Sequence, residues 1–297
     1  MCSLIRSEHS PSDTRQFREV GEACIPIVGE AEMAQKLRRD GKHVVVHKGR
    51  CWAEAHRGFY RPVNLLARLA SEQATWPTIR AWGFQACLTE SDARHANAAL
   101  PVHLVSDLDR FAEESLSSSH RHQLRKARRQ VRMVELTGPA LLREQGYEVL
   151  ISSLKRTAHR SPSSRAEYLA ALQHFDEPAH GIVLAGLIDG RLGGYITGYA
   201  VDGTAYVGSV VIATEALSTH ISTGLTYEFI FACRRSRGIH ELVHGLHARE
   251  DKGLCHYKER MGLSVRRVRS RVTMLPGAGA VIRRRSPHAY YRLTGRG

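Results

Sequence analysis

Several features are scarce in this sequence of 297 residues. Its six cysteines include no C-x-x-C pair, which argues against a zinc knuckle and against a disulfide scaffold. No apolar run approaches the roughly 18 residues of a membrane-spanning helix, and the first residues lack the apolar core of a signal peptide. We therefore expect a protein with no membrane span, located in the reducing cytoplasm.

Acidic residues are also scarce relative to basic ones. The chain has 29 aspartates and glutamates against 43 lysines and arginines, which gives a formal net charge of +14. Such a charge favours anionic partners, namely nucleic acids, phosphorylated cofactors or membrane surfaces, although it says nothing about the fold. A hydrophobic share of 42% is sufficient for a substantial core.

The chain divides into three parts by composition. Residues 1–22 are polar and contain serine and proline, so we expect a loose N-terminal arm. Residues 23–112 show mixed signals of a smaller α/β region, with a hairpin turn at Lys48-Gly49 and helical spacing over residues 58–73. Residues 113–297 begin with a basic helix and form the larger domain.

Residues 181–213 carry the clearest secondary-structure signal. Two Asp-Gly pairs, Asp189-Gly190 and Asp202-Gly203, separate runs of β-branched and aromatic residues, which predicts a three-stranded antiparallel meander. The pattern then continues as a helix (218–238), a strand (240–246), a helix (249–262) and a strand (264–275). The fold class expected is α/β (α+β), with a mixed, mostly antiparallel twisted sheet flanked by helices.

The predicted helix over residues 218–238 has an unusual start. Residues Ser218 to Gly224 are small or carry hydroxyl groups, apart from His220 and Ile221. Backbone N–H groups at such a helix start can approach a phosphate group closely. The plainer alternative is that serine, threonine and glycine only cap an ordinary core helix.

The order of these elements, together with the motif "HYKERMGL" over residues 256–263, resembles the GCN5-related N-acetyltransferase (GNAT) superfamily. The resemblance implies that acyl-CoA lies between two splayed strands, with its pyrophosphate at the start of the following helix. It implies that Tyr257 acts as the general acid beside the thiol. The residues that it places on the cofactor are Ser209, Val210, Val211 and Ile212 for the pantetheine, and Thr219, His220, Ile221, Ser222, Thr223 and Gly224 for the pyrophosphate.

The sequence departs from the family pattern at two places. The loop before the helix reads "THISTG" and keeps only Gly224 of the expected arginine and glycines, and Glu250 replaces a common asparagine. The layout also resembles the Fem-type branch, whose members have the same fold, carry a basic helix before the meander and take an aminoacyl group from tRNA. That resemblance allows the N-terminal region to be a reduced first copy of the fold.

The basic helix contains a stripe of arginines at positions i, i+4, i+7 and i+11. Like charges at this spacing repel each other, so we expect the stripe to bind an anion rather than to be a plain solvated surface. The ligand can be tRNA, a nucleotide-linked substrate or the phosphates of CoA. The residues predicted to bind it are Arg121, Arg125, Lys126, Arg128, Arg129 and Arg132.

Amine acylation also needs a general base. Glu215, Glu250 and His220 lie near the expected strand ends, and the sequence does not choose among them. We expect no metal site, because His244 and His247 would point to opposite faces of a strand and no cysteine or carboxylate completes a set with zinc spacing.

Three functions follow from these observations. The first is transfer of an acyl group, expected to be acetyl, from acyl-CoA to an amine, either a small molecule or a peptide. The second is a Fem-like transfer of an aminoacyl group from tRNA. The third is a non-catalytic nucleic-acid-binding protein built on a GNAT scaffold.

Overall fold

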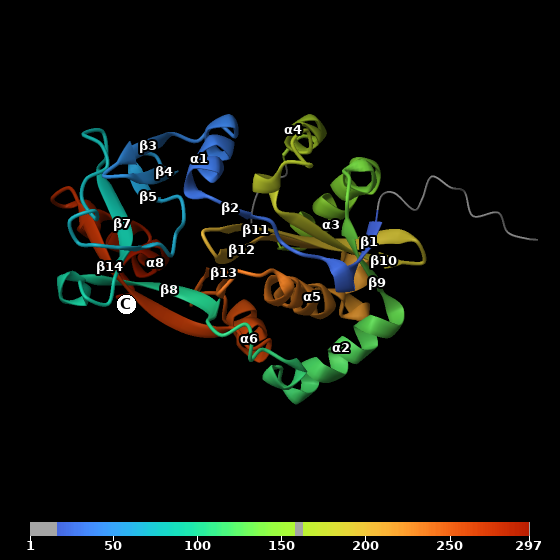
Figure 1. The fold of residues 1–297 in the computed structure, drawn as a ribbon. Coiled ribbons are helices and arrows are strands. Elements are labelled where there is room, and N and C mark those ends of the chain that lie inside the picture. Colours follow the sequence, from blue (N-terminus) through green and yellow to red (C-terminus); the bar gives the residue numbers. More distant parts are fainter. Residues whose placement is uncertain (1–16, 158–162, 297) are drawn as a thin grey trace, which may run out of the picture.

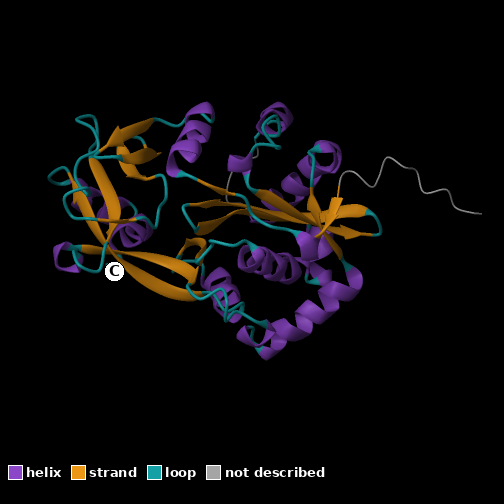
Figure 2. Cartoon of the chain, viewed as in Figure 1, coloured by secondary structure: helices purple, strands orange, loops and turns teal. Residues whose placement is uncertain are grey.

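The computed structural model describes residues 17–157 and 163–296. Fourteen strands form one sheet, which runs through the molecule with helices on both sides (Figures 1 and 2). Neighbouring strands along its main path are β1-β9-β10-β11-β12-β13-β8-β14-β7-β5-β4-β3. Most of these pairs are antiparallel, so the predicted fold class is confirmed.

The predicted meander is confirmed as β10 (Ile182–Ile188), β11 (Arg191–Val201) and β12 (Thr204–Ile212). Both Asp-Gly turns have positive φ angles, with Asp189 at 48° and Gly190 at 77°. The sheet continues beyond β10 through β9 (Arg132–Leu136) to β1 (Phe17–Glu19). Residues 17–22 of the expected arm are therefore β1 and a short 3-10 turn, while residues 1–16 lie outside the described residues.

Helices cover both faces of the meander (Figure 1). Helix α5 (Ile221–Arg235) packs on one face, and α3 (Tyr147–Thr157) lies on the other. The approach of α5 is close, because a Cβ atom on Gly198 of β11 would lie 2.2 Å from the Phe229 ring. The remaining helices of this part are α2 (Ser118–Gln130), which crosses α5, a π-helical turn (Leu142–Gly146) and α4 (Arg165–Ala171).

The chain after α5 links the two halves of the sheet. Strand β13 (Glu241–Leu246) runs parallel to β12, and α6 (Lys252–Arg260) leads into β14 (Ser264–Met274). Strand β14 lies between β8 and β7, both of which come from the N-terminal region. Helices α7 (Ala278–Arg285) and α8 (Pro287–Thr294) follow, and α8 contacts β8.

The N-terminal region contains one α-helix, a short 3-10 turn (Ala93–His95) and most of the shorter strands. The hairpin predicted at Lys48-Gly49 is confirmed, but the helix expected over residues 58–73 is wrong. Pro62 lacks the N–H that a helix interior needs, and the segment forms two short strands instead. The elements are β2 (Ile27–Val28), α1 (Glu30–Arg39), β3 (Val44–His47), β4 (Arg50–His56), β5 (Phe59–Pro62), β6 (Arg68–Leu69), β7 (Gly83–Leu88) and β8 (Ala98–Val105).

Candidate functional site

Strands β12 and β13 pair over three residues and then separate. The last pair is Tyr206 with Val243, so the second half of β12 has no partner on that side within the described sheet. A β-bulge interrupts β12 at the same level, because Val207 pairs with Gly198 and Ser209 with Thr197. Gly208 and Ser209 are exposed. The edge of β12 that they form is unpaired where β12 and β13 separate.

The first turn of α5 follows β12 after a 3-10 turn (Thr214–Thr219), and Ile221 packs on Gly186 of β10 and Gly193 of β11. His220 has a φ of 57°, and its carbonyl accepts the N–H groups of Thr223 at 3.0 Å and Gly224 at 3.2 Å. Within the described residues no acceptor meets the N–H groups of Ile221 and Ser222. Two backbone donors therefore remain for an anion, and the positive end of the helix dipole favours one.

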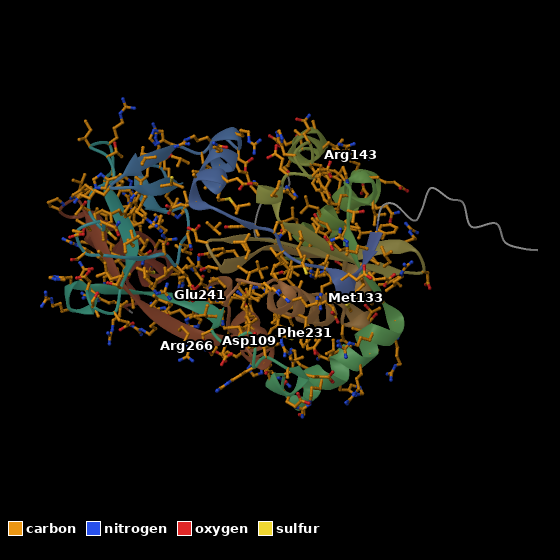
Figure 3. The ribbon with its side chains drawn as sticks, in the orientation of Figure 1. Asp109, Met133, Arg143, Phe231, Glu241 and Arg266 are labelled. Atoms are coloured by element: carbon orange, nitrogen blue, oxygen red, sulfur yellow. The ribbon has the colours of Figure 1, made fainter. Side chains whose placement is uncertain are left out.

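Helix α2 and strand β9 cover part of this first turn. The Thr223 hydroxyl donates to Oε1 of Gln123 at 3.2 Å, and a Cβ atom on Gly224 would lie 1.9 Å from Cε of Met133. Figure 3 labels Met133 on β9. The buried Ile221 side chain points to the sheet, where it lies against Gly186. Of the six residues predicted to hold a pyrophosphate, Thr219, His220 and Ser222 are partly exposed.

Tyr257 of α6 contacts α5 just beyond its first turn. Its hydroxyl lies 3.1 Å from the Thr226 hydroxyl, and the side chains of Ser222 and Thr223 are close enough to lower its pKa. Burial raises the pKa of the Tyr257 phenol, so the group stays protonated at neutral pH. A protonated phenol beside a leaving group is what a general acid requires, and the role remains a prediction.

His120 of α2 is a residue that the sequence analysis did not single out. It is buried, its Nδ1 lies 3.2 Å from the Ser117 hydroxyl, and its ring centroid is 5.5 Å from that of Tyr257. Its buried Nε2 has no hydrogen-bond partner among the described residues. Burial, followed by the nearby charges of Arg260, His256 and His220, lowers the pKa of His120, so the ring is neutral and its free nitrogen can accept a proton.

The three predicted bases have different surroundings. Burial lowers the pKa of His220, and the charges of Lys126 and His122 act in the same direction, so His220 lies beside α2. Glu215 lines a cavity of about 520 Å³ together with Thr219. Glu250 is ion-paired with Arg292 of α8, which holds its carboxylate against the C-terminal helix.

Three arginines of the predicted basic stripe already have hydrogen-bond or ion-pair partners within the protein. Arg132 lies on β9 and pairs with Glu19, so it does not belong to the helix as predicted; α2 ends at Gln130. Arg128 pairs with Glu113 at 3.1 Å and Glu228 at 3.6 Å. Arg121 donates to the Leu116 carbonyl at 3.2 Å.

Three basic side chains of α2 have no ion-pair partner among the described residues. Among the described residues no acidic group forms an ion pair with Arg125, Lys126 or Arg129. Lys126 lies close enough to His220 to lower its pKa, so this positive group borders the start of α5. Their charge is available to an anionic ligand.

The meander, the separated parallel strands and the helix between them together define a GNAT-like fold. No protein-family model matches the sequence, and no curated protein does. Solved structures do match, and they bear out at the level of the fold the predicted resemblance to the GNAT superfamily and its Fem-type branch.

Three of these structures cover nearly the whole chain. The C-terminal domain of a protein assigned as a lysylphosphatidylglycerol synthetase from Agrobacterium fabrum is 13% identical, with a TM-score of 0.58 over 90% of this chain and 98% of that one. FemX is 9% identical, with a TM-score of 0.57 over 90% and 96%. L-PGS from Bacillus licheniformis is 11% identical, with a TM-score of 0.53 over 93% and 99%.

No helix among the described residues combines the length and the apolar composition needed to cross a bilayer. The roles predicted for the individual site residues, and the domain boundary at residues 112 and 113, remain predictions.

Proposed function

We propose that this protein is an acyltransferase that transfers an aminoacyl group from tRNA to an amine. The observation that carries the proposal is that α2, which packs against α5, bears three cations without an ion-pair partner among the described residues, Arg125, Lys126 and Arg129, and that Lys126 lies near His220 at the start of α5. Phosphate contacts supply most of the sequence-independent affinity for a nucleic acid. The full-length similarity to structures named FemX and L-PGS also supports this donor.

A second candidate donor is acyl-CoA. The open edge of β12 at Gly208 and Ser209, and the free N–H groups of Ile221 and Ser222, favour a pantetheine and a pyrophosphate respectively. The covering of Thr223 and Gly224 by α2 and β9 weighs against it, because it narrows the seat for a diphosphate. We therefore rank tRNA first.

The chemistry assigns roles to buried His120 and to half-buried Tyr257. The amine nitrogen attacks the ester carbonyl carbon of the aminoacyl group, a C–N bond forms, and the C–O bond to the ribose breaks. The neutral Nε2 of His120 accepts the proton that the amine loses. The Tyr257 phenol donates a proton to the departing ribose oxygen.

The test compares the two donors in parallel. Radiolabelled aminoacyl-tRNA and radiolabelled acetyl-CoA are each incubated with the protein and a panel of amines, from polyamines to lysine-containing peptides. We expect label to move from tRNA to an amine and none to move from acetyl-CoA. The matched variants His120→Asn and Tyr257→Phe should slow the transfer and leave the affinity for tRNA unchanged.

Two results would overturn the proposal. Transfer from acetyl-CoA alone would replace it by the second candidate. Binding of tRNA without transfer from any donor would favour a non-catalytic nucleic-acid-binding protein.

A further inference from the structure

A cluster of metal-binding side-chain types lies where β8, the end of β13 and α6 meet. His103 of β8, His247 just after β13 and Cys255 of α6 each offer one ligand atom, and these atoms lie within 4.8 Å of one another. The two imidazole rings are in edge contact, with centroids 5.4 Å apart. The sequence predicts no metal site, because no cysteine or carboxylate lies at zinc spacing from His244 and His247. The fold brings His103 and Cys255 to His247 from distant elements.

His103 is the member with an unexplained nitrogen. Its side chain is 0% exposed, and its Nδ1 lies 3.3 Å from the Leu263 carbonyl, to which it can donate. Its Nε2 is buried without a hydrogen-bond partner among the described residues. A buried nitrogen with a free lone pair costs free energy unless a proton donor or a metal ion satisfies it.

The second histidine is oriented in the same way. Nδ1 of His247 lies 2.6 Å from the Tyr291 hydroxyl on α8, which leaves Nε2 as the ligand atom. Metal-binding histidines almost always use their other ring nitrogen in such a bond, which sets the tautomer and the ring orientation. The Cys255 thiol donates to the Ala248 carbonyl at 3.3 Å, so its sulfur is held at the edge of the cluster.

We propose that His103, His247 and Cys255 bind a divalent transition-metal ion, with zinc as the best match to two imidazoles and one thiolate. Zinc prefers four ligands, and three protein ligands leave one position open. A cavity of about 600 Å³ adjoins the cluster and is lined by His247, Cys255 and Glu259, so water or a ligand can occupy the fourth position. Cys255 binds as the thiolate and releases its proton to solvent.

One nearby charge opposes the ion. The Lys258 side chain is buried, donates to the His244 carbonyl at 2.6 Å and lies close enough to His103 to lower its pKa. A thiolate ligand offsets this positive charge, which is why the cysteine is essential to the proposal. A site with the two histidines alone would be far weaker.

The test uses the 297-residue protein, from which a chelator has removed bound metal, titrated with Co²⁺ and then with Zn²⁺ to displace the cobalt. We expect one equivalent of cobalt to bind, with the absorbance of a four-coordinate ion and a thiolate-to-cobalt charge-transfer band. Cys255→Ser should abolish that band and weaken binding at least tenfold. Tyr291→Phe should weaken it roughly 10–100-fold, as expected when a partner of a ligating histidine is removed.

Two matched variants serve as controls. His256→Gln removes an exposed imidazole from the same cavity, and Cys24→Ser removes an exposed thiol elsewhere; both should bind cobalt as the parent does. If Cys255→Ser is misfolded by circular dichroism, His247→Gln replaces it, because His247 is only partly buried. The proposal is overturned if the folded parent takes up no stoichiometric cobalt, or if the charge-transfer band survives in Cys255→Ser.

Discussion

The contrast between paired and unpaired cations on α2 leads to a quantitative prediction about binding of tRNA. Arg125, Lys126 and Arg129 have no ion-pair partner in the described part of the chain, whereas Arg128 pairs with Glu113 and Glu228. Replacing the three unpaired cations by glutamine should remove phosphate contacts. Arg128→Gln removes the same kind of charge from the same helix, but one that is already neutralised.

The magnitude follows from counterion release. Each phosphate contact contributes about −0.9 to the slope of log K against log salt for a duplex and about −0.7 for a single strand. Loss of three contacts should therefore reduce the slope by roughly 2 to 3, while Arg128→Gln should leave it within about half a unit of the parent. The two ion pairs of Arg128 are partly exposed, and pairs at the surface contribute roughly 0–1 kcal/mol each, so we expect Arg128→Gln to remain folded.

The assay is fluorescence anisotropy of a labelled tRNA, titrated with protein at a series of potassium chloride concentrations. Circular dichroism melting establishes that every variant is folded at the assay temperature. The reasoning is refuted if the triple variant keeps the slope of the parent. It is equally refuted if Arg128→Gln lowers the slope as much as the triple variant does.

Three further predictions concern catalysis, packing and pH. Tyr257→Phe should lower the turnover number by about 10²–10⁴ with little change in melting temperature, and unchanged turnover would exclude it as the acid. Gly198→Ala places a Cβ atom 2.2 Å from Phe229 and should lower the free energy of unfolding in urea by about 1–3 kcal/mol. The control is Gly21→Ala, whose Cβ atom meets nothing within 4 Å. Equal effects of the two substitutions would contradict the prediction. Burial, and then the charge of Lys258, lowers the pKa of His244 to about 3, whereas the unfolded value is near 6.5. Between these two pKa values the unfolded chain binds more protons than the folded one, so the free energy of unfolding should fall by about 2 kcal/mol from pH 6.5 to 5. His244→Gln should make the free energy of unfolding depend less on pH over that range, as measured by urea unfolding at each pH.

The order of the C-terminal elements could be predicted because its signals are local. An Asp-Gly pair allows the positive φ angles of a tight hairpin wherever it occurs, and the meander forms as expected at Asp189 and Asp202. Helix α5 shows apolar spacing and basic residues in its last turn, and it ends at Arg235. These features depend on residues a few positions apart, so the chain alone specifies them.

Residues 58–73 show where local spacing is misleading. The apolar positions suit a helix, yet the segment is held by side chains from distant strands. The Tyr206 hydroxyl donates to Oδ1 of buried Asn64 at 2.6 Å and accepts the N–H of Leu66 at 3.0 Å. These hydrogen bonds form only because β12 lies next to the segment, so they cannot be predicted from residues 58–73 alone.

The location of one basic residue was misjudged for a similar reason. Helical spacing extends from Arg121 to Arg132, but the helix ends at Gln130, and β9 pairs with β10 from Arg132 onward. Cavities formed between elements are also invisible to the sequence. Figure 3 shows Glu241 of β13 and Arg266 of β14 near each other, where they line one cavity of about 620 Å³.

Short-range chemistry in the sequence was enough to establish the meander, the helix after it and the excess of positive charge. The tertiary structure alone decided which of those charges are neutralised, that Gln123 and Met133 pack against the first turn of α5, and that His120 lies against Tyr257. It also brought His103, His247 and Cys255 together. The physical reason is that turns and helix ends depend on backbone preferences of neighbouring residues, whereas burial and side-chain contact depend on which surfaces pack against each other.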